Sequence, residues 1–205
     1  MSKMCISCFN EIESNSLREL LENNPVLCKE CISKIKTKLS FERIDGCNIL
    51  FLGEYDGMIK SWLMNFKEYG DIELAKAFLY VYLPLIKLLY HGYIFVPCPS
   101  SDERNNKRGF IHLEEILKAY NLPYWLALSK KSSFERKNLK ALGRISSKDE
   151  ITLNDKAKEI ENKKIVIFDD VYTTGFTFKS SLNALKKANP KRIRGLILMN
   201  ANKSL

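Results

Sequence analysis

The residues best suited to binding a phosphorylated ligand lie together late in the chain. An apolar, β-branched run, Lys164–Phe168, is followed by two aspartates and then by a short loop of threonine and glycine. The run predicts a buried strand, and the sequence after the loop predicts a helix from about Phe178 to Ala188 that Asn189-Pro190 stops. Two acids and a helix N-terminus would then meet at the carboxyl end of one strand.

The loop and the start of this helix suit a phosphate. The first backbone amides of a helix have no partner inside it and the helix dipole is positive there, so a 5′-phosphate fits at that end. Gly175 lets the backbone approach an anion closely, and threonine hydroxyls add donors. The expected phosphate-binding residues are Val171, Thr173, Thr174, Gly175, Phe176 and Thr177.

The two acids, Asp169 and Asp170, suit a ribose and are the catalytic candidates. Their carboxylates can accept hydrogen bonds from ribose hydroxyls, directly or through a hydrated Mg²⁺. The alternative is an ordinary turn with Thr177 capping the helix. The order of strand, acid pair, Thr-Thr-Gly and helix favours the phosphate-and-ribose site.

Four of the six cysteines form two CxxC pairs, made by Cys5, Cys8, Cys28 and Cys31. Tetrahedral Zn²⁺ takes four thiolates, and each pair offers two. Forty residues cannot bury a core of their own, so a metal would supply stability. Two disulfides or a redox pair are the alternatives, although cytoplasmic proteins seldom keep disulfides. We expect a structural zinc ion in a domain of residues 1–40, ahead of a main domain of residues 41–205.

A set of mostly basic residues could bind a pyrophosphate or the phosphates of DNA: Lys67, Ser100, Arg104, Lys107 and Arg108. Arginine suits bidentate contact with phosphate oxygens. The alternative, strongest for Lys107, is an ordinary solvated loop. A further basic run at residues 130–144 could be a DNA track or a solvated hood. His91 and His112 lack metal-ligand spacing, and we expect both to be structural.

Strand and helix patterns alternate along the rest of the chain. Strands are expected at Ile49–Phe51, Tyr93–Val96, Leu126–Leu128 and Arg194–Asn200, and helices at Met58–Asn65, Leu113–Ala119 and Ile72–Leu89, the last ended or kinked by Pro84. This alternation predicts an α/β, Rossmann-like fold with a mainly parallel sheet covered by helices on both faces. Such sheets bind ligands beyond the carboxyl ends of their strands.

The composition is that of a globular protein with an excess of positive charge. Lys and Arg number 33 against 24 Asp and Glu, a formal net charge of +9. This excess would attract nucleic acid in a salt-dependent way, or it could simply solvate the surface. The apolar runs are too short or too charged to span a bilayer, and Met1–Asn10 does not read as a signal peptide. We expect a cytoplasmic protein without membrane insertion.

Residues 165–177 resemble the phosphoribosyl-pyrophosphate (PRPP) motif of type I phosphoribosyltransferases. The whole chain resembles the ComF family of competence-associated, phosphoribosyltransferase-like proteins, which includes the GntX type. The CxxC pairs open the chain as in that family. Its tyrosine segment resembles Phe51–Gly57, and its Lys-Tyr-x-Gly segment resembles Lys67–Gly70. Its Pro-x-Pro segment resembles Val96–Ser100, and its Arg-Gly-Phe segment resembles Arg108-Gly109-Phe110. The family then continues Asn-Gln, where Ile111 and His112 stand here.

The resemblance implies a role in natural transformation, handling imported single-stranded DNA in the cytoplasm. The site would bind Mg²⁺–PRPP or a 5′-phosphoribosyl-like group, and DNA-uptake helicase or channel proteins would be partners. An active phosphoribosyltransferase with a nitrogenous acceptor and a non-catalytic PRPP-sensing module are the alternatives. Homodimers are common in such folds, but the sequence does not demonstrate one.

Overall fold

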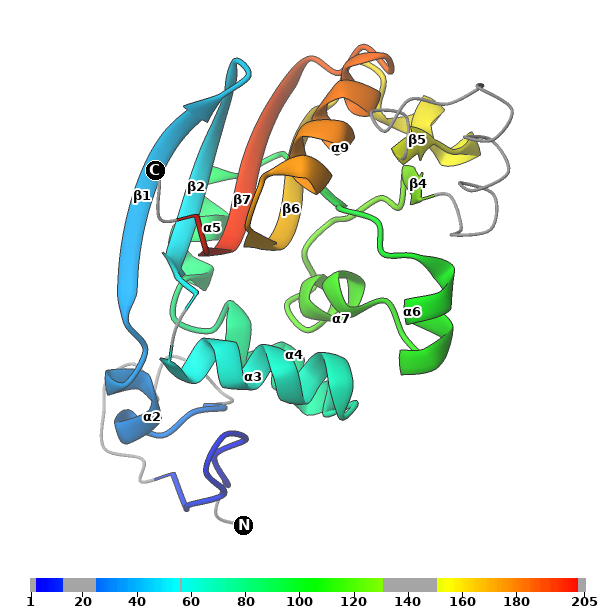
Figure 1. Cartoon of the computed structure of the whole chain (residues 1–205). Helices are drawn as coiled ribbons and strands as arrows, with labels where there is room; N and C mark the ends of the chain where they lie inside the picture. Colours follow the sequence, from blue (N-terminus) through cyan, green and yellow to red (C-terminus); the bar gives the residue numbers. More distant parts are fainter. Residues whose placement is uncertain (1–2, 13–24, 56, 131–150, 203–205) are drawn as a thin grey trace.

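A computed structural model describes residues 3–12, 25–55, 57–130 and 151–202 (Figure 1). Its centre is a five-stranded sheet in the order β1-β2-β7-β6-β3. The strands are β1 (Thr37–Ile44), β2 (Cys47–Glu54), β3 (Ile94–Pro97), β6 (Lys164–Tyr172) and β7 (Arg192–Asn200). β1 and β2 form an antiparallel hairpin, and all other neighbours are parallel. The predicted α/β fold with a mainly parallel sheet is confirmed.

Helices cover both faces of this sheet (Figure 1). Two adjacent residues of β7 show this, because neighbouring side chains in a strand point to opposite faces. A Cβ on Gly195 would lie 2.8 Å from the ring of Phe178 in α9 (Phe176–Lys186). Arg194 instead donates a 3.2 Å hydrogen bond to the carbonyl of Leu89, the last residue of α5 (Leu83–Leu89).

The other helices and a small second sheet surround this core. They are α2 (Lys29–Ser33), α3 (Gly57–Glu68), η1 (Ile72–Leu74), α4 (Ala75–Phe78), α6 (Asp102–Arg108), α7 (His112–Lys118), η3 (Asp155–Ile160), and the antiparallel pair β4 (Leu128–Lys130) and β5 (Ile151–Leu153). Figure 1 shows α3, α6 and α7 beyond the carboxyl ends of β6 and β7. This is the edge at which the sequence predicts the ligand site.

The predicted end of the late strand, at Phe168, is wrong. β6 continues through Asp169 and Asp170 to Tyr172 because β7 goes on pairing with it, up to the pair Tyr172↔Asn200. On its other side β6 loses its neighbour, since β3 stops at the pair Pro97↔Phe168. The two acids therefore lie within a strand, at the step where one of its edges becomes free.

Several helix boundaries also differ from the prediction. α9 begins at Phe176 rather than near Phe178. The segment expected as one helix over Ile72–Leu89 is divided into η1, α4 and α5. Pro84 does not end a helix but stands in the first turn of α5, where a missing N–H costs no hydrogen bond. Strand β1 and helix α6 are absent from the prediction.

The N-terminal cysteine segment packs against the main fold. Cys5, Cys28 and Cys31 belong to the same buried cluster as the sheet residues. The expected boundary at residue 40 falls inside β1, and the division into two domains stays a prediction. Among the described residues no helix has the length and apolarity needed to cross a membrane.

Candidate functional site

A cavity of about 250 Å³ opens at the step where β6 passes the end of β3. Asp169 and Asp170 lie in its wall and are 8% and 6% exposed. The cavity brings them together with other predicted site residues, namely Lys67, Ser100, Arg104, Val171 and Thr177. Helix α3 and the segment of Ser100 and Arg104, both distant in sequence, thus meet the acid pair and the loop that follows it.

Asp170 is held by two donors on one oxygen. The Lys67 ammonium from α3 and Nε2 of His112 from α7 both contact Oδ2, the latter at 2.6 Å. Burial by itself would raise the pKa of Asp170, but the charge of Lys67 and the hydrogen bond from His112 outweigh burial and hold it well below its usual range. Asp170 is therefore an anion, and its Oδ1 has no hydrogen-bond partner among the described residues.

His112 was expected to be merely structural, but it lies in the cavity wall. Its Nδ1 is 3.0 Å from Nη1 of Arg108, and a guanidinium can only donate. Nδ1 must therefore accept, so the ring is neutral and Nε2 donates its proton to Asp170. Burial lowers the pKa of His112 in agreement, although Asp170 acts against it. The only sequence signal was its place just after Arg108-Gly109-Phe110.

Arg108 completes the connection by donating from Nε to the carbonyl of Lys67 at 3.0 Å. Lys67 and Arg108, both expected to bind phosphate, are thus engaged within the protein. Their contacts join α3, the end of α6 and α7 to β6.

Asp169 has the opposite electrostatic character. Its Oδ1 accepts a 3.0 Å hydrogen bond from the backbone N–H of Asp170. Burial and the charge of Asp170 raise the pKa of Asp169 to about 7. One member of the acid pair is therefore charged and the other holds a proton up to neutral pH, so the pair offers both an acceptor and a donor to a sugar.

The loop after the acids has the conformation needed at the start of α9. Gly175, the residue before the helix, has φ +73°, and a Cβ there would overlap the Tyr172 ring. Thr174 Oγ1 accepts a 3.4 Å hydrogen bond from the Phe176 N–H. Of the predicted loop residues, Val171 and Thr177 line the cavity, whereas Thr173, Thr174, Gly175 and Phe176 do not.

A second cavity of about 550 Å³ adjoins the first and shares Lys67, Ser100, Arg104 and His112 with it. It adds the remaining predicted residues, Lys107 and Arg108. Arg104 and Lys107 are exposed on α6, a helix rather than the expected loop. The predicted basic run of residues 130–144 lies outside the described residues except for Lys130, which lines the first cavity.

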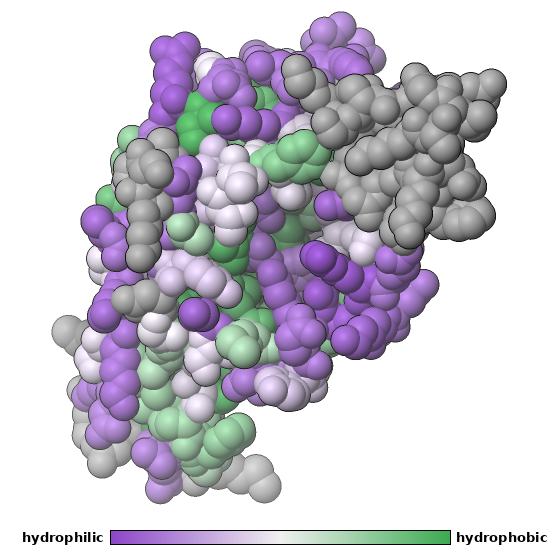
Figure 2. All heavy atoms as spheres, in the orientation of Figure 1, coloured by the Kyte–Doolittle hydropathy of each residue, from purple (hydrophilic) through white to green (hydrophobic). Residues whose placement is uncertain are grey.

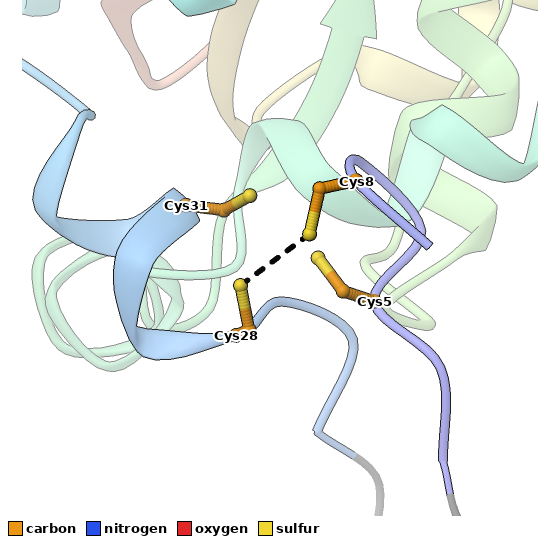
Figure 3. Close-up of side chains that lie close together, drawn as sticks. All are labelled: Cys5, Cys8, Cys28 and Cys31. Atoms are coloured by element: carbon orange, nitrogen blue, oxygen red, sulfur yellow. Dashed lines mark hydrogen bonds between the residues drawn. The ribbon is translucent and has the colours of Figure 1, made fainter. Parts of the chain in front are cut away.

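The four predicted metal ligands form one cluster, with sulfur atoms within 4.8 Å of one another (Figure 3). Cys8 Sγ lies 3.6 Å from Cys28 Sγ. A tetrahedral site with Zn–S bonds of about 2.3 Å has edges of about 3.8 Å, whereas a disulfide bond is about 2.05 Å long. The cysteines are free thiols in this arrangement, and the set is compatible with structural zinc.

The cysteine cluster is attached to a helix that contributes to the ligand site. Trp62 of α3 donates from Nε1 to Ser7 Oγ at 2.9 Å, and Ser7 stands between Cys5 and Cys8. Ile6 donates to the Val26 carbonyl at 3.0 Å, which joins the two cysteine segments. A metal at the cluster would thus support the middle of α3, five residues before Lys67.

The class of protein follows from this fold, the acid-pair site and a comparison of sequences. Residues 106–205 match the family model described as the phosphoribosyl transferase domain. The chain has a type I phosphoribosyltransferase-like domain preceded by a four-cysteine cluster. Two solved structures are similar to this chain. A hypoxanthine phosphoribosyl transferase of Trypanosoma cruzi is 14% identical over 65% of this chain and 66% of that chain, with a TM-score of 0.40. A hypoxanthine-guanine phosphoribosyltransferase of Bacillus anthracis is 14% identical over 63% of this chain and 69% of that chain, with a TM-score of 0.41.

Two curated relatives share sequence similarity with this chain. Competence protein ComFC of Streptococcus pneumoniae is 26% identical over 95% of this chain and 99% of its own length. Competence protein ComFC of Bacillus subtilis is 29% identical over 64% of this chain and 55% of its own length. The chain is thus similar to ComFC competence proteins over most of its length, and these relatives support a role in competence.

Proposed function

We propose that this protein handles imported single-stranded DNA in the cytoplasm and binds PRPP, or a 5′-phosphoribosyl-like group such as the 5′-phosphate and sugar of a DNA end, in the cavity at the acid pair. The observation that carries the proposal is the unlike pair Asp169 and Asp170 beside the N-terminus of α9. A neutral and a charged carboxyl suit the two vicinal hydroxyls of PRPP better than two charged ones, because one hydroxyl can donate while the other accepts.

The phosphate end of the ligand lies, in this proposal, at the start of α9. The first amides of that helix and the Thr177 hydroxyl are the donors, and the helix dipole favours an anion there. Gly175 supports the site because it has no Cβ, so the turn before α9 can pass close to the Tyr172 ring. A ribose attached to that phosphate can then reach the free Oδ1 of Asp170.

The pyrophosphate of PRPP, or the next phosphate of a strand, is bound in this proposal by the exposed cations. Arg104 and Lys107 are in no ion pair with a described residue, unlike Lys67, whose charge is shared with Asp170. Mg²⁺ that enters with PRPP would be held by the acid pair and would neutralise part of the pyrophosphate charge. Helicase or channel partners and a homodimer remain predictions.

An active phosphoribosyltransferase is the second candidate, because its reaction would use the same acids and the same cations. It requires in addition a nitrogenous acceptor. Pyrophosphate release from Mg²⁺–PRPP, measured across a set of acceptor bases, separates a transferase from a binding protein.

The test of the main proposal is fluorescence anisotropy of labelled, 5′-phosphorylated single-stranded DNA with the full, zinc-loaded chain. We expect binding that weakens with salt and is displaced by Mg²⁺–PRPP. Asp170→Asn should lose the displacement. Asp45→Asn is the matched control, because Asp45 lies in the exposed β1–β2 turn at φ 48°, a conformation that asparagine tolerates.

Each contrary result has its own meaning. Absence of DNA binding at low salt would contradict the DNA part of the proposal. DNA binding that PRPP does not alter would place the strand away from the acid pair. A thermal shift by Mg²⁺–PRPP that survives Asp170→Asn would remove the acid pair from the ligand site.

A further inference from the structure

The second cavity contains an aromatic side chain that the phosphate-and-ribose site does not use. Tyr69 lines this cavity and is 79% exposed, more than any other large apolar or aromatic side chain among the described residues. A ring so exposed contributes almost nothing to the core. Its position is therefore better explained by a ligand than by packing.

The backbone beneath this ring is fixed, although the ring is free. Tyr69 and Asp71 both donate their N–H groups to the Asn65 carbonyl, at 3.1 and 3.2 Å, and Gly70 between them has φ +75°. This is the pattern of a helix C-terminus closed by a left-handed glycine. The ring is thus presented at the end of α3, in the cavity wall, without an ordering cost for the backbone.

The charges of this cavity favour an anionic ligand. Four cationic side chains line it against one acidic side chain: Lys67, Arg104, Lys107 and Arg108 against Glu68. Arg104 and Lys107 stand three residues apart on α6 and so share one side of that helix. Figure 2 shows hydrophilic residues gathered over α6. An exposed aromatic ring beside exposed cations is the combination that binds the base and the phosphate of a single strand.

The cavity is also continuous with the site at the acid pair. Both are lined by Lys67, Ser100, Arg104 and His112. A strand whose 5′ end occupies the first cavity would have its next nucleotide in the second. A neutral peptide or a free neutral base would leave the cations of α6 unused.

We propose that the second cavity is a nucleotide-binding site for single-stranded DNA, in which one base stacks on Tyr69 and the adjacent phosphate contacts Arg104 and Lys107. This inference rests on the proposed function and names the place on the surface where the strand is held. Stacking needs only a π-face, so the site reads no particular base.

The test compares Tyr69→Ala with Phe41→Ala, an exposed aromatic of β1 that is 70% exposed, in the full zinc-loaded chain. We expect Tyr69→Ala to weaken binding of single-stranded DNA about tenfold, the scale of one stacked base. Tyr69→Trp and Phe41→Ala should bind as the wild type does. The salt dependence of DNA binding should stay unchanged in Tyr69→Ala. In Arg104→Gln/Lys107→Gln, the slope of log binding constant against log salt concentration should become shallower by about 0.7 for each phosphate that the protein no longer neutralises.

A strand with a single abasic position, moved stepwise from the 5′ end, provides the second readout. When the abasic position falls at Tyr69, the abasic strand should bind the wild type as weakly as an intact strand binds Tyr69→Ala. The same abasic strand should bind Tyr69→Ala no more weakly than the intact strand does. If the wild type binds DNA and Tyr69→Ala binds as well as Phe41→Ala, this inference is wrong and the proposed function stands. If the wild type binds no DNA, this inference and the DNA part of the proposed function are both wrong.

Discussion

Nε2 of His112 lies 2.6 Å from Oδ2 of Asp170, and the opposite ring nitrogen accepts from Arg108 at 3.0 Å. The position thus requires a group that accepts on one side and donates on the other. A neutral imidazole meets this requirement, and so does the glutamine side chain that the ComF resemblance places here. His112 is therefore a positioning residue that ties the charged acid of the site to α6.

The first prediction compares two replacements of His112. His112→Gln keeps an acceptor for Arg108 and a donor for Asp170, so we expect stability near that of the wild type. His112→Phe leaves the buried Asp170 and the half-buried Arg108 each short of one hydrogen bond and should lower the free energy of unfolding by about 1–3 kcal/mol. Urea denaturation measures the difference.

The same two variants test the role of His112 in binding. If it positions Asp170, displacement of DNA by Mg²⁺–PRPP should weaken in His112→Phe and be retained in His112→Gln. Equal stability and equal displacement in both variants would contradict a positioning role.

The second prediction concerns the pH dependence of stability. Asp169 has a pKa of about 7 in the folded chain, against about 3.9 in an unfolded one. Between these values the folded chain holds one more proton, so rising pH lowers the free energy of unfolding, by at most about 1.4 kcal/mol per pH unit. The loss is absent below about pH 4 and complete above about pH 7.

Asp169→Asn removes this titration while keeping the acceptor for the Asp170 N–H. We expect the variant to gain stability relative to the wild type as pH rises from about 4 to about 7, and to keep that gain at higher pH. Asp170, whose pKa is lowered, stabilises the fold above its unfolded pKa and loses this effect as pH falls, in both proteins alike. Parallel stability curves for the two proteins would show that Asp169 is ionised in the folded state.

The third prediction isolates the contact between Gly175 and Tyr172. Gly175 and Gly92 have nearly the same φ, +73° and +71°, but a Cβ on Gly92 meets nothing within 4 Å. Gly92→Ala should cost only the left-handed backbone strain of about 1–2 kcal/mol. Gly175→Ala adds the overlap with the Tyr172 ring, so it should be clearly less stable and should lose the thermal shift by Mg²⁺–PRPP. Equal costs in urea denaturation would mean that the loop moves freely away from the ring.

The sequence was sufficient to predict the elements that carry a local pattern. The apolar run before Asp169 and the two CxxC pairs each predict their structure without knowledge of the rest of the chain. β1 was missed because it is an edge strand with no buried residue, so it has no regular apolar alternation. α6 was missed because it buries none of its residues.

The contacts within the site depend on tertiary structure and could not be read from spacing. Lys67 and His112 reach Asp170 from helices that are distant from it in sequence. The extension of β6 past Phe168 likewise follows from pairing with β7, which no local pattern of β6 encodes. The prediction thus placed the acids at the correct edge of the sheet but did not predict their unlike charges.

The last prediction is that the purified chain contains one zinc ion and that this ion supports α3. Cys28→Ser should lose the metal, whereas Cys47→Ser should retain it, because Cys47 is buried in β2 outside the cluster. Metal analysis of the two variants measures this directly.

The fluorescence of Trp62 provides an optical readout of metal loss from the cysteine cluster. It is 4% exposed and donates to Ser7 inside the first CxxC pair, so loss of the metal should expose its ring. In a Trp125→Phe background Trp62 is the remaining tryptophan. We expect chelation to shift its emission to longer wavelength and to lower the melting temperature, with Cys47→Ser responding as the wild type does. Emission and melting temperature that do not change on removal of zinc would show that the cluster does not stabilise α3.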